Sequence, residues 1–110
     1  MPTVSELYDE AIALQQAGKL DEAVGKLEAL VAAHPDFALA HAGLSAFYGK
    51  LNRHDEAIAQ AQKVCELDPA DPFSFMAMSL ICQRAGRIAE AEQALAQAME
   101  LQWATRGGAE

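Results

Sequence analysis

The sequence has few of the residues that sheets, disulfide frameworks and membrane spans require. Aromatic residues make up only 6% of the 110-residue chain, whereas about half of the chain is apolar and alanine is abundant. A β-sandwich needs valine, isoleucine, threonine and aromatic side chains, so this composition favours helices that pack closely through small residues. The length suits one domain, and we expect it to span 1–110.

Cysteine is also scarce. Cys65 and Cys82 are the two in the chain, and they stand 17 positions apart with no CxxC spacing. This pattern indicates neither a disulfide framework nor a zinc site, and we interpret both residues as small apolar core residues in a reducing compartment.

The sequence shows no targeting signal and no long apolar run. Its first residues have neither a basic segment nor an apolar segment of the kind that secretory signals carry. No stretch approaches the roughly 20 apolar residues of a membrane span. We therefore predict a cytoplasmic protein that does not bind membranes.

Basic residues are outnumbered two to one, with 8 lysines and arginines against 16 acidic residues and a formal net charge of -8. An acidic chain repels phosphate backbones, so the composition disfavours nucleic-acid binding. The simplest interpretation of the acidic surface is that it keeps a small protein in solution.

The chain contains a repeat with a period of 34 residues. Pro35 and Pro69 are separated by this period, and a short segment with the same features recurs three times. These segments are Gly18-Lys-Leu-Asp-Glu-Ala23, Asn52-Arg-His-Asp-Glu-Ala57 and Gly86-Arg-Ile-Ala-Glu-Ala91. Such self-similarity is the signature of a repeat architecture.

The pattern resembles the tetratricopeptide repeat family, whose motif is W-x2-L-G-x2-Y, then A-x3-F, then P. The repeats are 4–37, 38–71 and 72–105, with a tail of 106–110. Glu10 and Trp103 depart from the motif, and both lie in terminal repeats, where atypical residues are expected. The second repeat follows the motif through His41, Leu44, Ser45, Tyr48, Ala57, Ala61 and Pro69.

The resemblance implies an all-α fold, a right-handed α-solenoid of three helix-turn-helix units with six antiparallel helices. Local signals agree with it. Thr3 and Glu6 form a capping box, Gly18 can adopt the left-handed conformation that ends a helix, and Asp71 precedes Pro72 as a helix cap. We predict helices near 4–17, 20–33, 37–51, 54–67, 72–85 and 88–103.

In this family the first helix of each repeat lines a concave groove that binds a protein or peptide. The resemblance places an apolar floor there, beside a basic edge at Lys50 and Arg84, which follow Gln16 at the repeat period. The alternatives are that part of this stripe packs within the array and that the basic edge is a solvated surface. The predicted floor consists of Tyr8, Ile12, Leu39, Phe73, Met76 and Leu80.

Some family members grip a chaperone's terminal carboxylate with a clamp of lysine, asparagine and arginine. The matching positions here are Tyr8, Ile12, Gly43, Phe73 and Ala77, which cannot make those bonds. We therefore expect an adaptor or scaffold that holds a peptide or an amphipathic helix by its apolar face. The alternatives are a structural homo-oligomer and a helper chaperone for an amphipathic client.

The sequence carries no pattern typical of catalysis. It has no GxSxG, no HExxH and no phosphate-binding glycine-rich loop. No further ligand or base shares an obvious face with His34, His41 or His54. We predict no enzyme activity, no metal and no cofactor.

The third repeat is expected to leave apolar surface uncovered, because the residues after Trp103 are too few for the extra helix that usually closes such arrays. The predicted surface comprises Ile81, Met99, Leu101 and Trp103. Either Trp103 folds back over this end, or two chains cover each other as a homodimer.

Overall fold

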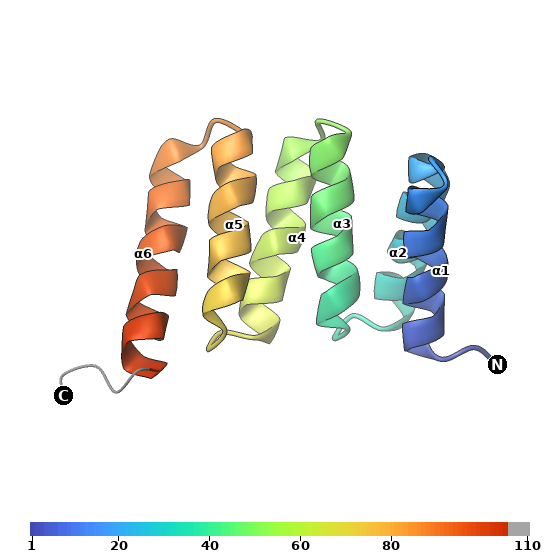
Figure 1. Cartoon of the computed structure of the whole chain (residues 1–110), viewed down its shortest axis with the longest axis horizontal. Helices are drawn as coiled ribbons and strands as arrows, with labels where there is room; N and C mark the ends of the chain where they lie inside the picture. Colours follow the sequence, from blue (N-terminus) through green and yellow to red (C-terminus); the bar gives the residue numbers. More distant parts are fainter. Residues whose placement is uncertain (106–110) are drawn as a thin grey trace.

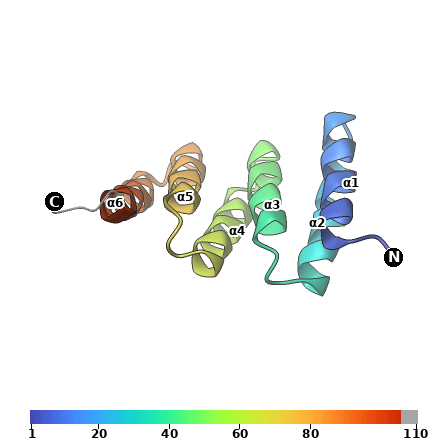
Figure 2. The same cartoon turned by 60° about the horizontal axis from the view of Figure 1, so that its bottom comes forward.

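The computed structural model describes residues 1–105, which form six α-helices and no strand. The helices stand as three antiparallel pairs in one row, with the two ends of the described chain at opposite ends of the row (Figure 1). Figure 2 shows the pairs advancing in one direction from α1 to α6. The helices are α1 (Val4–Gln16), α2 (Leu20–Ala33), α3 (Ala38–Lys50), α4 (His54–Leu67), α5 (Pro72–Arg84) and α6 (Ile88–Thr105).

The predicted helix starts are confirmed at α1 and α5. The Thr3 hydroxyl accepts a hydrogen bond from the Glu6 backbone N–H at 3.1 Å, and the Glu6 carboxylate accepts one from the Thr3 N–H at 3.0 Å. At α5, the Asp71 carboxylate accepts from the Phe73 N–H, and Pro72 occupies the first turn, where a missing N–H costs nothing.

The turn inside each repeat has the same backbone conformation. Gly18, Asn52 and Gly86 have φ angles of 81°, 61° and 79°, which lie in the left-handed region. This conformation ends the first helix of each pair and lets the second helix return along it. The recurrence of glycine or asparagine every 34 residues therefore sets the antiparallel pairing.

Small side chains fill the helix crossings. Ala11, Ala23 and Ala57 are fully buried, and Leu27 and Leu44 are fully buried beside them in one continuous core. Small residues let helix axes approach closely, so three short pairs share a single apolar interior. Cys65 and Cys82 also lie in this core as free thiols, as predicted, and burial raises the pKa of both.

The two departures from the repeat motif have structural reasons. Glu10 lies on α1, half exposed, and its carboxylate pairs with the Lys26 ammonium of α2 at 2.8 Å. Trp103 occupies the position that Pro35 and Pro69 hold in the first two repeats. Because tryptophan, unlike proline, has a backbone N–H to donate, the helix continues through this position. As a result, α6 has 18 residues, whereas α2 and α4 have 14 each.

The predicted helix ends agree with the observed ones to within two residues. The predicted tail, 106–110, lies outside the described residues. No helix in 1–105 is both long enough and apolar enough to cross a membrane.

Candidate protein-binding groove

Helices α3 and α5 enclose a small apolar pocket above α4. The pocket has a volume of about 180 Å³. Alanine dominates its walls, and Leu80 and Ile81 of α5 supply the larger side chains. The pocket exists because the short alanine side chains of α3 and α5 leave room between two helices that stay close to parallel. Its lining includes Ala42, Ala46, Ala61, Val64, Ala77 and Arg84.

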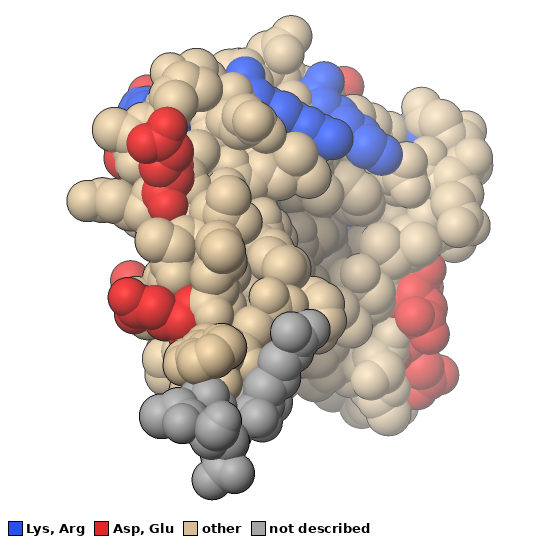
Figure 3. Space-filling view, turned by 60° about the vertical axis from the view of Figure 1, so that its left-hand side comes forward, with Lys and Arg blue, Asp and Glu red and all other residues tan. Residues whose placement is uncertain are grey.

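The groove formed by this pocket and its rims has a different chemistry at each end. Leu39 and Phe73, at the starts of α3 and α5, are 50% and 69% exposed. Lys50 and Arg84 lie in the last turns of the same two helices. Figure 3 shows basic side chains gathered at one edge of the molecule, beside a hollow whose visible walls are mostly uncharged. The groove is thus apolar at one rim and basic at the other.

The two basic side chains of the groove have no acidic partner in the described chain. Among residues 1–105, neither Lys50 nor Arg84 forms an ion pair. The Lys50 ammonium lies 5.9 Å from the centre of the Phe47 ring. These two cations stand out on a protein of net charge -8.

The remaining predicted floor residues are less available. Tyr8 and Ile12 of α1 are half-buried and pack against the core, and the Tyr8 ring meets the Phe37 ring edge-on at 6.2 Å between centroids. Desolvation raises the pKa of Tyr8. Met76 is also half-buried. The structure therefore brings together Leu80 and Arg84 at the pocket and leaves Leu39 and Phe73 exposed at the starts of α3 and α5, while Tyr8 and Ile12 of α1 pack against the core.

The predicted C-terminal surface needs one correction. The expectation that Ile81 stays partly exposed is wrong, because Ile81 is buried and lines the groove pocket. It belongs to the inner helix α5 and points back toward Gly49 of α3, where its Cδ1 would lie 3.8 Å from an added Cβ. Its counterpart one repeat earlier, Phe47, is buried in the same way.

The other predicted residues of this surface lie on α6. Met99 and Trp103 are 60% and 63% exposed, and Leu101 is half-buried. The sequence-based prediction missed Ile88 and Leu95, which are also exposed. Helical spacing places Ile88, Leu95, Met99 and Trp103 on one stripe of α6, and this periodicity is the signal that would have found them.

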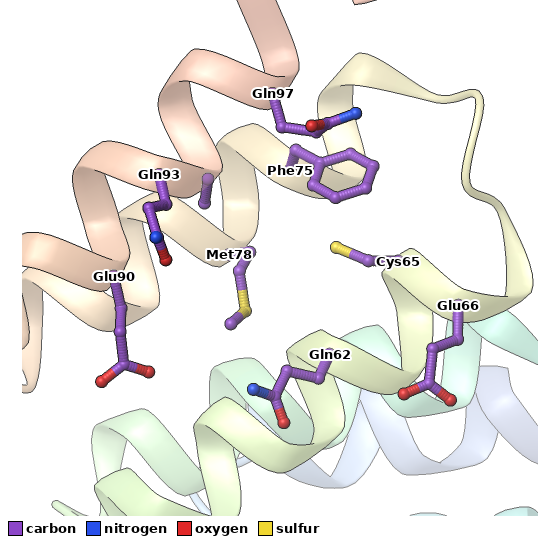
Figure 4. Close-up of a pocket in the computed structure, with 9 residues that line it drawn as sticks. Gln62, Cys65, Glu66, Phe75, Met78, Glu90, Gln93 and Gln97 are labelled. Atoms are coloured by element: carbon purple, nitrogen blue, oxygen red, sulfur yellow. The ribbon is translucent and has the colours of Figure 1, made fainter.

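A second cavity, which the sequence did not lead us to expect, opens between α4 and α6 on the opposite side of α5 from the groove. Its volume is about 530 Å³. Figure 4 shows Phe75, Met78 and Cys65 at its centre, with Glu66 and Glu90 at opposite ends. The rest of the lining is Gln62, Gln93, Ala94 and Gln97. We call this cavity the back cleft.

One of the three histidines, His41, has a structural role. His41 is buried, its Nε2 donates to the Pro35 carbonyl at 2.8 Å, and its Nδ1 lies 2.6 Å from the Gln60 side-chain amide. Within 1–105, no group of three or more His, Cys, Asp or Glu residues is arranged to hold a metal ion.

The helices form antiparallel pairs that repeat every 34 residues, and a groove lies between the first helices of successive pairs. This arrangement defines a helical-repeat protein of the solenoid class. The chain matches the tetratricopeptide repeat model over residues 8–72, which is more than half of its length. It belongs to the tetratricopeptide repeat family.

Solved structures agree with this assignment. The chain is similar to MamA (20% identity, TM-score 0.85) over 96% of its own length, and it spans 61% of that protein's chain. It is similar to the second tetratricopeptide domain of Spaghetti (RPAP3) bound to an HSP90 peptide, with 21% identity and a TM-score of 0.78 over 89% of this chain and 91% of that one. At these identities the likeness concerns the fold.

The type III secretion translocator chaperone SycD of Yersinia enterocolitica is 27% identical, with a TM-score of 0.80 over 90% of this chain and 75% of that one. None of the curated proteins matches the sequence.

Proposed function

We propose that this protein is a protein-interaction module whose groove holds an amphipathic helix or peptide. The observation that carries the proposal is the pairing of exposed Phe73 and Leu80 with an almost wholly apolar pocket beside them. Exposed apolar surface of this kind marks interaction sites in soluble proteins. Covering such side chains contributes about 25 cal/mol per Å² of apolar area removed from water.

The basic rim suggests the orientation of the ligand. Lys50 and Arg84 have no acidic partner within the described chain, so a ligand with acidic residues next to its apolar face would supply one. The apolar residues of that ligand would then lie toward Leu39 and Phe73. The groove would therefore recognise such a ligand through its acidic and apolar side chains.

A carboxylate clamp does not fit this groove. At the five clamp positions, Tyr8 and Ile12 pack against the core, and a Cβ added to Gly43 would come within 2.9 Å of a Leu27 methyl carbon. Phe73 and Ala77 present no cation or amide. The likeness to SycD, which is a translocator chaperone, instead supports the variant in which the client is an amphipathic segment of another protein.

Leu80→Asp combined with Phe73→Asp tests the proposal against a matched control. Leu95 and Met99 lie on α6 outside the groove and are 44% and 60% exposed, close to the 46% of Leu80 and the 69% of Phe73. Leu95→Asp combined with Met99→Asp therefore introduces the same two charges at similar exposure. Affinity capture from the source organism, followed by titration with the recovered partner, should show binding lost in the groove variant and retained in the control. Equal binding by both folded variants would refute the groove.

A second candidate function, a structural homo-oligomer, is favoured by the exposed stripe on α6. One and two repeats earlier, the positions of Leu95 are held by Ala61 and Leu27, which are buried in the core. Met99 corresponds to Cys65, which is buried as well. The stripe therefore repeats a surface that is covered elsewhere in the array.

We propose that a second copy covers this stripe when the chain self-associates. Sedimentation velocity over a concentration series should show a dimer that is lost in Met99→Glu with Trp103→Glu. A monomer at every concentration would remove this candidate.

The free buried thiols of Cys65 and Cys82 fit a reducing compartment, and we propose the cytoplasm as the location.

A further inference from the structure

The back cleft exists because a polar plug found between the first two repeats is missing between the last two. At the junction of the first two repeats, the Tyr48 hydroxyl of α3 donates to the Glu28 carboxylate of α2 at 2.6 Å. The Arg53 guanidinium stacks on the Tyr48 ring at 4.4 Å and donates twice to Glu56, at 2.7 and 2.6 Å. These four side chains form one connected polar group at the first junction between repeats, which we call the polar plug.

A second pair of side chains completes this plug. The His41 ring lies 2.6 Å from the Gln60 amide and also donates to the Pro35 carbonyl. His41 and Gln60 come from the two different helices of the second repeat, so the pair spans the space between α3 and α4.

The equivalent residues 34 positions later cannot build the plug. Tyr48 is replaced by Cys82, which is too short to reach across the junction and has no phenol to donate. His41 and Gln60 are replaced by Phe75 and Ala94, which form no hydrogen bond with each other. Arg87, the counterpart of Arg53, bonds to Asp55 and Glu90 at the exposed end of the junction. Phe75 and Ala94 both line the cleft of about 530 Å³.

The chemistry of the cleft is that of a binding site for a chain with apolar and basic groups. Its centre is formed by the side chains of Phe75, Met78 and Cys65, which suit an aliphatic side chain. Glu66 and Glu90 stand at its opposite ends (Figure 4), and no lysine or arginine lines it.

The amides of the cleft have unused hydrogen-bonding capacity. Within residues 1–105, the side chains of Gln62, Gln93 and Gln97 make no hydrogen bond, and Glu66 makes neither a hydrogen bond nor an ion pair. A primary amide both donates and accepts, which matches the N–H and C=O groups of an extended peptide.

We propose that the back cleft binds an extended peptide segment that places an aliphatic side chain between two basic ones. The aliphatic side chain would enter the centre at Met78 and Phe75, and the glutamines would bond to the peptide backbone. One basic group would pair with Glu66, and the other would pair with Oε2 of Glu90, whose Oε1 is bound to Arg87 at 3.5 Å. This site is separate from the groove, which carries the opposite charge at its rim, so the protein would hold two segments of different chemistry at once.

Charge argues for this occupant over a second copy of the chain. The protein has a net charge of -8, and α6 contains Glu90, Glu92 and Glu100 but no basic residue in its described length. Bringing another acidic surface against Glu66 and Glu90 would leave like charges facing each other.

The test uses three blocked pentapeptides and nuclear magnetic resonance. In an extended chain alternate side chains share a face, so Lys-Ala-Leu-Ala-Lys presents leucine and both lysines together. Glu-Ala-Leu-Ala-Glu reverses the charge, and Lys-Ala-Ala-Ala-Lys keeps the charge without the leucine. The Met78 methyl and the side-chain amides of Gln62, Gln93 and Gln97 report on the cleft, while the Leu80 methyls report on the groove.

The first peptide should shift the Met78 and glutamine signals to saturation, leave Leu80 unmoved, and bind at least about tenfold more tightly than either control peptide. Phe75→His with Ala94→Gln rebuilds the histidine–glutamine pair of the first junction and should abolish these shifts. Glu66→Gln with Glu90→Gln should weaken binding by about tenfold or more while keeping the cleft open.

Several results would overturn the proposal. They are no binding of the first peptide, equal binding of all three, shifts at Leu80 in place of Met78, and unchanged binding by the Glu66→Gln, Glu90→Gln variant. If the plugged variant fails to fold, as judged by its circular dichroism, the glutamine double variant decides alone. Because Leu80 reports separately, failure here is distinguishable from failure of the groove.

Discussion

Each buried polar side chain in the described chain has a defined partner. The Ser45 and Ser79 hydroxyls donate to the carbonyls of Ala57 and Ala91 at 2.9 and 2.8 Å, which ties the two helices of a repeat together at the same place in the second and third repeats. No buried side-chain nitrogen or oxygen in 1–105 lacks a hydrogen bond. An unsatisfied buried group would cost about 1–3 kcal/mol, so this pairing matters in a small core.

Ser45→Ala should lower the free energy of unfolding by about 0.5–1.5 kcal/mol, the usual contribution of one hydrogen bond. The loss is small because Ala11 holds the same position in the first repeat, fully buried and without a hydroxyl. Ser45→Leu should cost a further 1–3 kcal/mol or so through overpacking. Urea midpoints measure both variants, and equal midpoints for the two would contradict the packing argument.

Tyr48 should titrate late. Burial, followed by its hydrogen bond to Glu28, raises the pKa of Tyr48 from 10.0 to about 12. Because the folded pKa lies above the unfolded one, the neutral phenol's contribution to stability is complete below about pH 10 and is lost as the pH rises through about 12. Tyrosinate absorbance in alkaline titration should lose a component near pH 12 in Tyr48→Phe. Loss of a component near pH 10 would show that the phenol is not held by the fold.

At the scale of the element, helix ends are decided by single residues. Left-handed conformations at Gly18, Asn52 and Gly86 end the first helix of each pair, and the absence of proline at Trp103 lets α6 run on to Thr105. This extension carries Trp103 into the exposed stripe of α6, where its side chain is 63% exposed.

Gly86→Ala should destabilise the protein by about 1–2 kcal/mol, because an added Cβ is strained in the left-handed region. Gly25 provides the matched control, since it lies inside α2 and a Cβ added there would have nothing within 4 Å. Gly25→Ala should stabilise by about 0.5–1 kcal/mol through helix propensity. Thermal melts of both variants test the difference, which would be absent if backbone conformation had no role at Gly86.

At the scale of the whole molecule, each repeat contacts only its neighbours along the row. The α3–α4 pair has a repeat on both sides, whereas α1 and α6 stand at the ends of the described array. In such arrays stability is approximately a sum of repeat and interface contributions. The groove and the back cleft both use the interface between the second and third repeats, so ligands at either site would stabilise that interface.

Hydrogen exchange should follow this arrangement. Backbone amides of α3 and α4 should exchange most slowly, and those of α1 and α6 faster, since end repeats open without disturbing the centre. A groove ligand should slow exchange in α5 more than in α1. Uniform protection across all six helices would indicate a single cooperative unit and contradict the solenoid description.

The sequence by itself determined the helices, their order and the family. The 34-residue spacing of Gly18, Asn52 and Gly86 encodes turns, and the alanines between them encode close crossings, because both are local or short-range constraints written in residue type. The capping residues Thr3 and Asp71 act within three positions of the helices they begin, so they were predictable as well.

Only the tertiary structure decided which side chains are available. Ile81 is buried by α3, and Tyr8 is partly covered by Phe37, so their exposure depended on neighbours distant in sequence. The back cleft is lined by Phe75 and Ala94, which stand where the preceding repeat has His41 and Gln60, and this difference matters only once α4, α5 and α6 are packed together. Packing between repeats, which no single repeat encodes, created both the groove pocket and the back cleft.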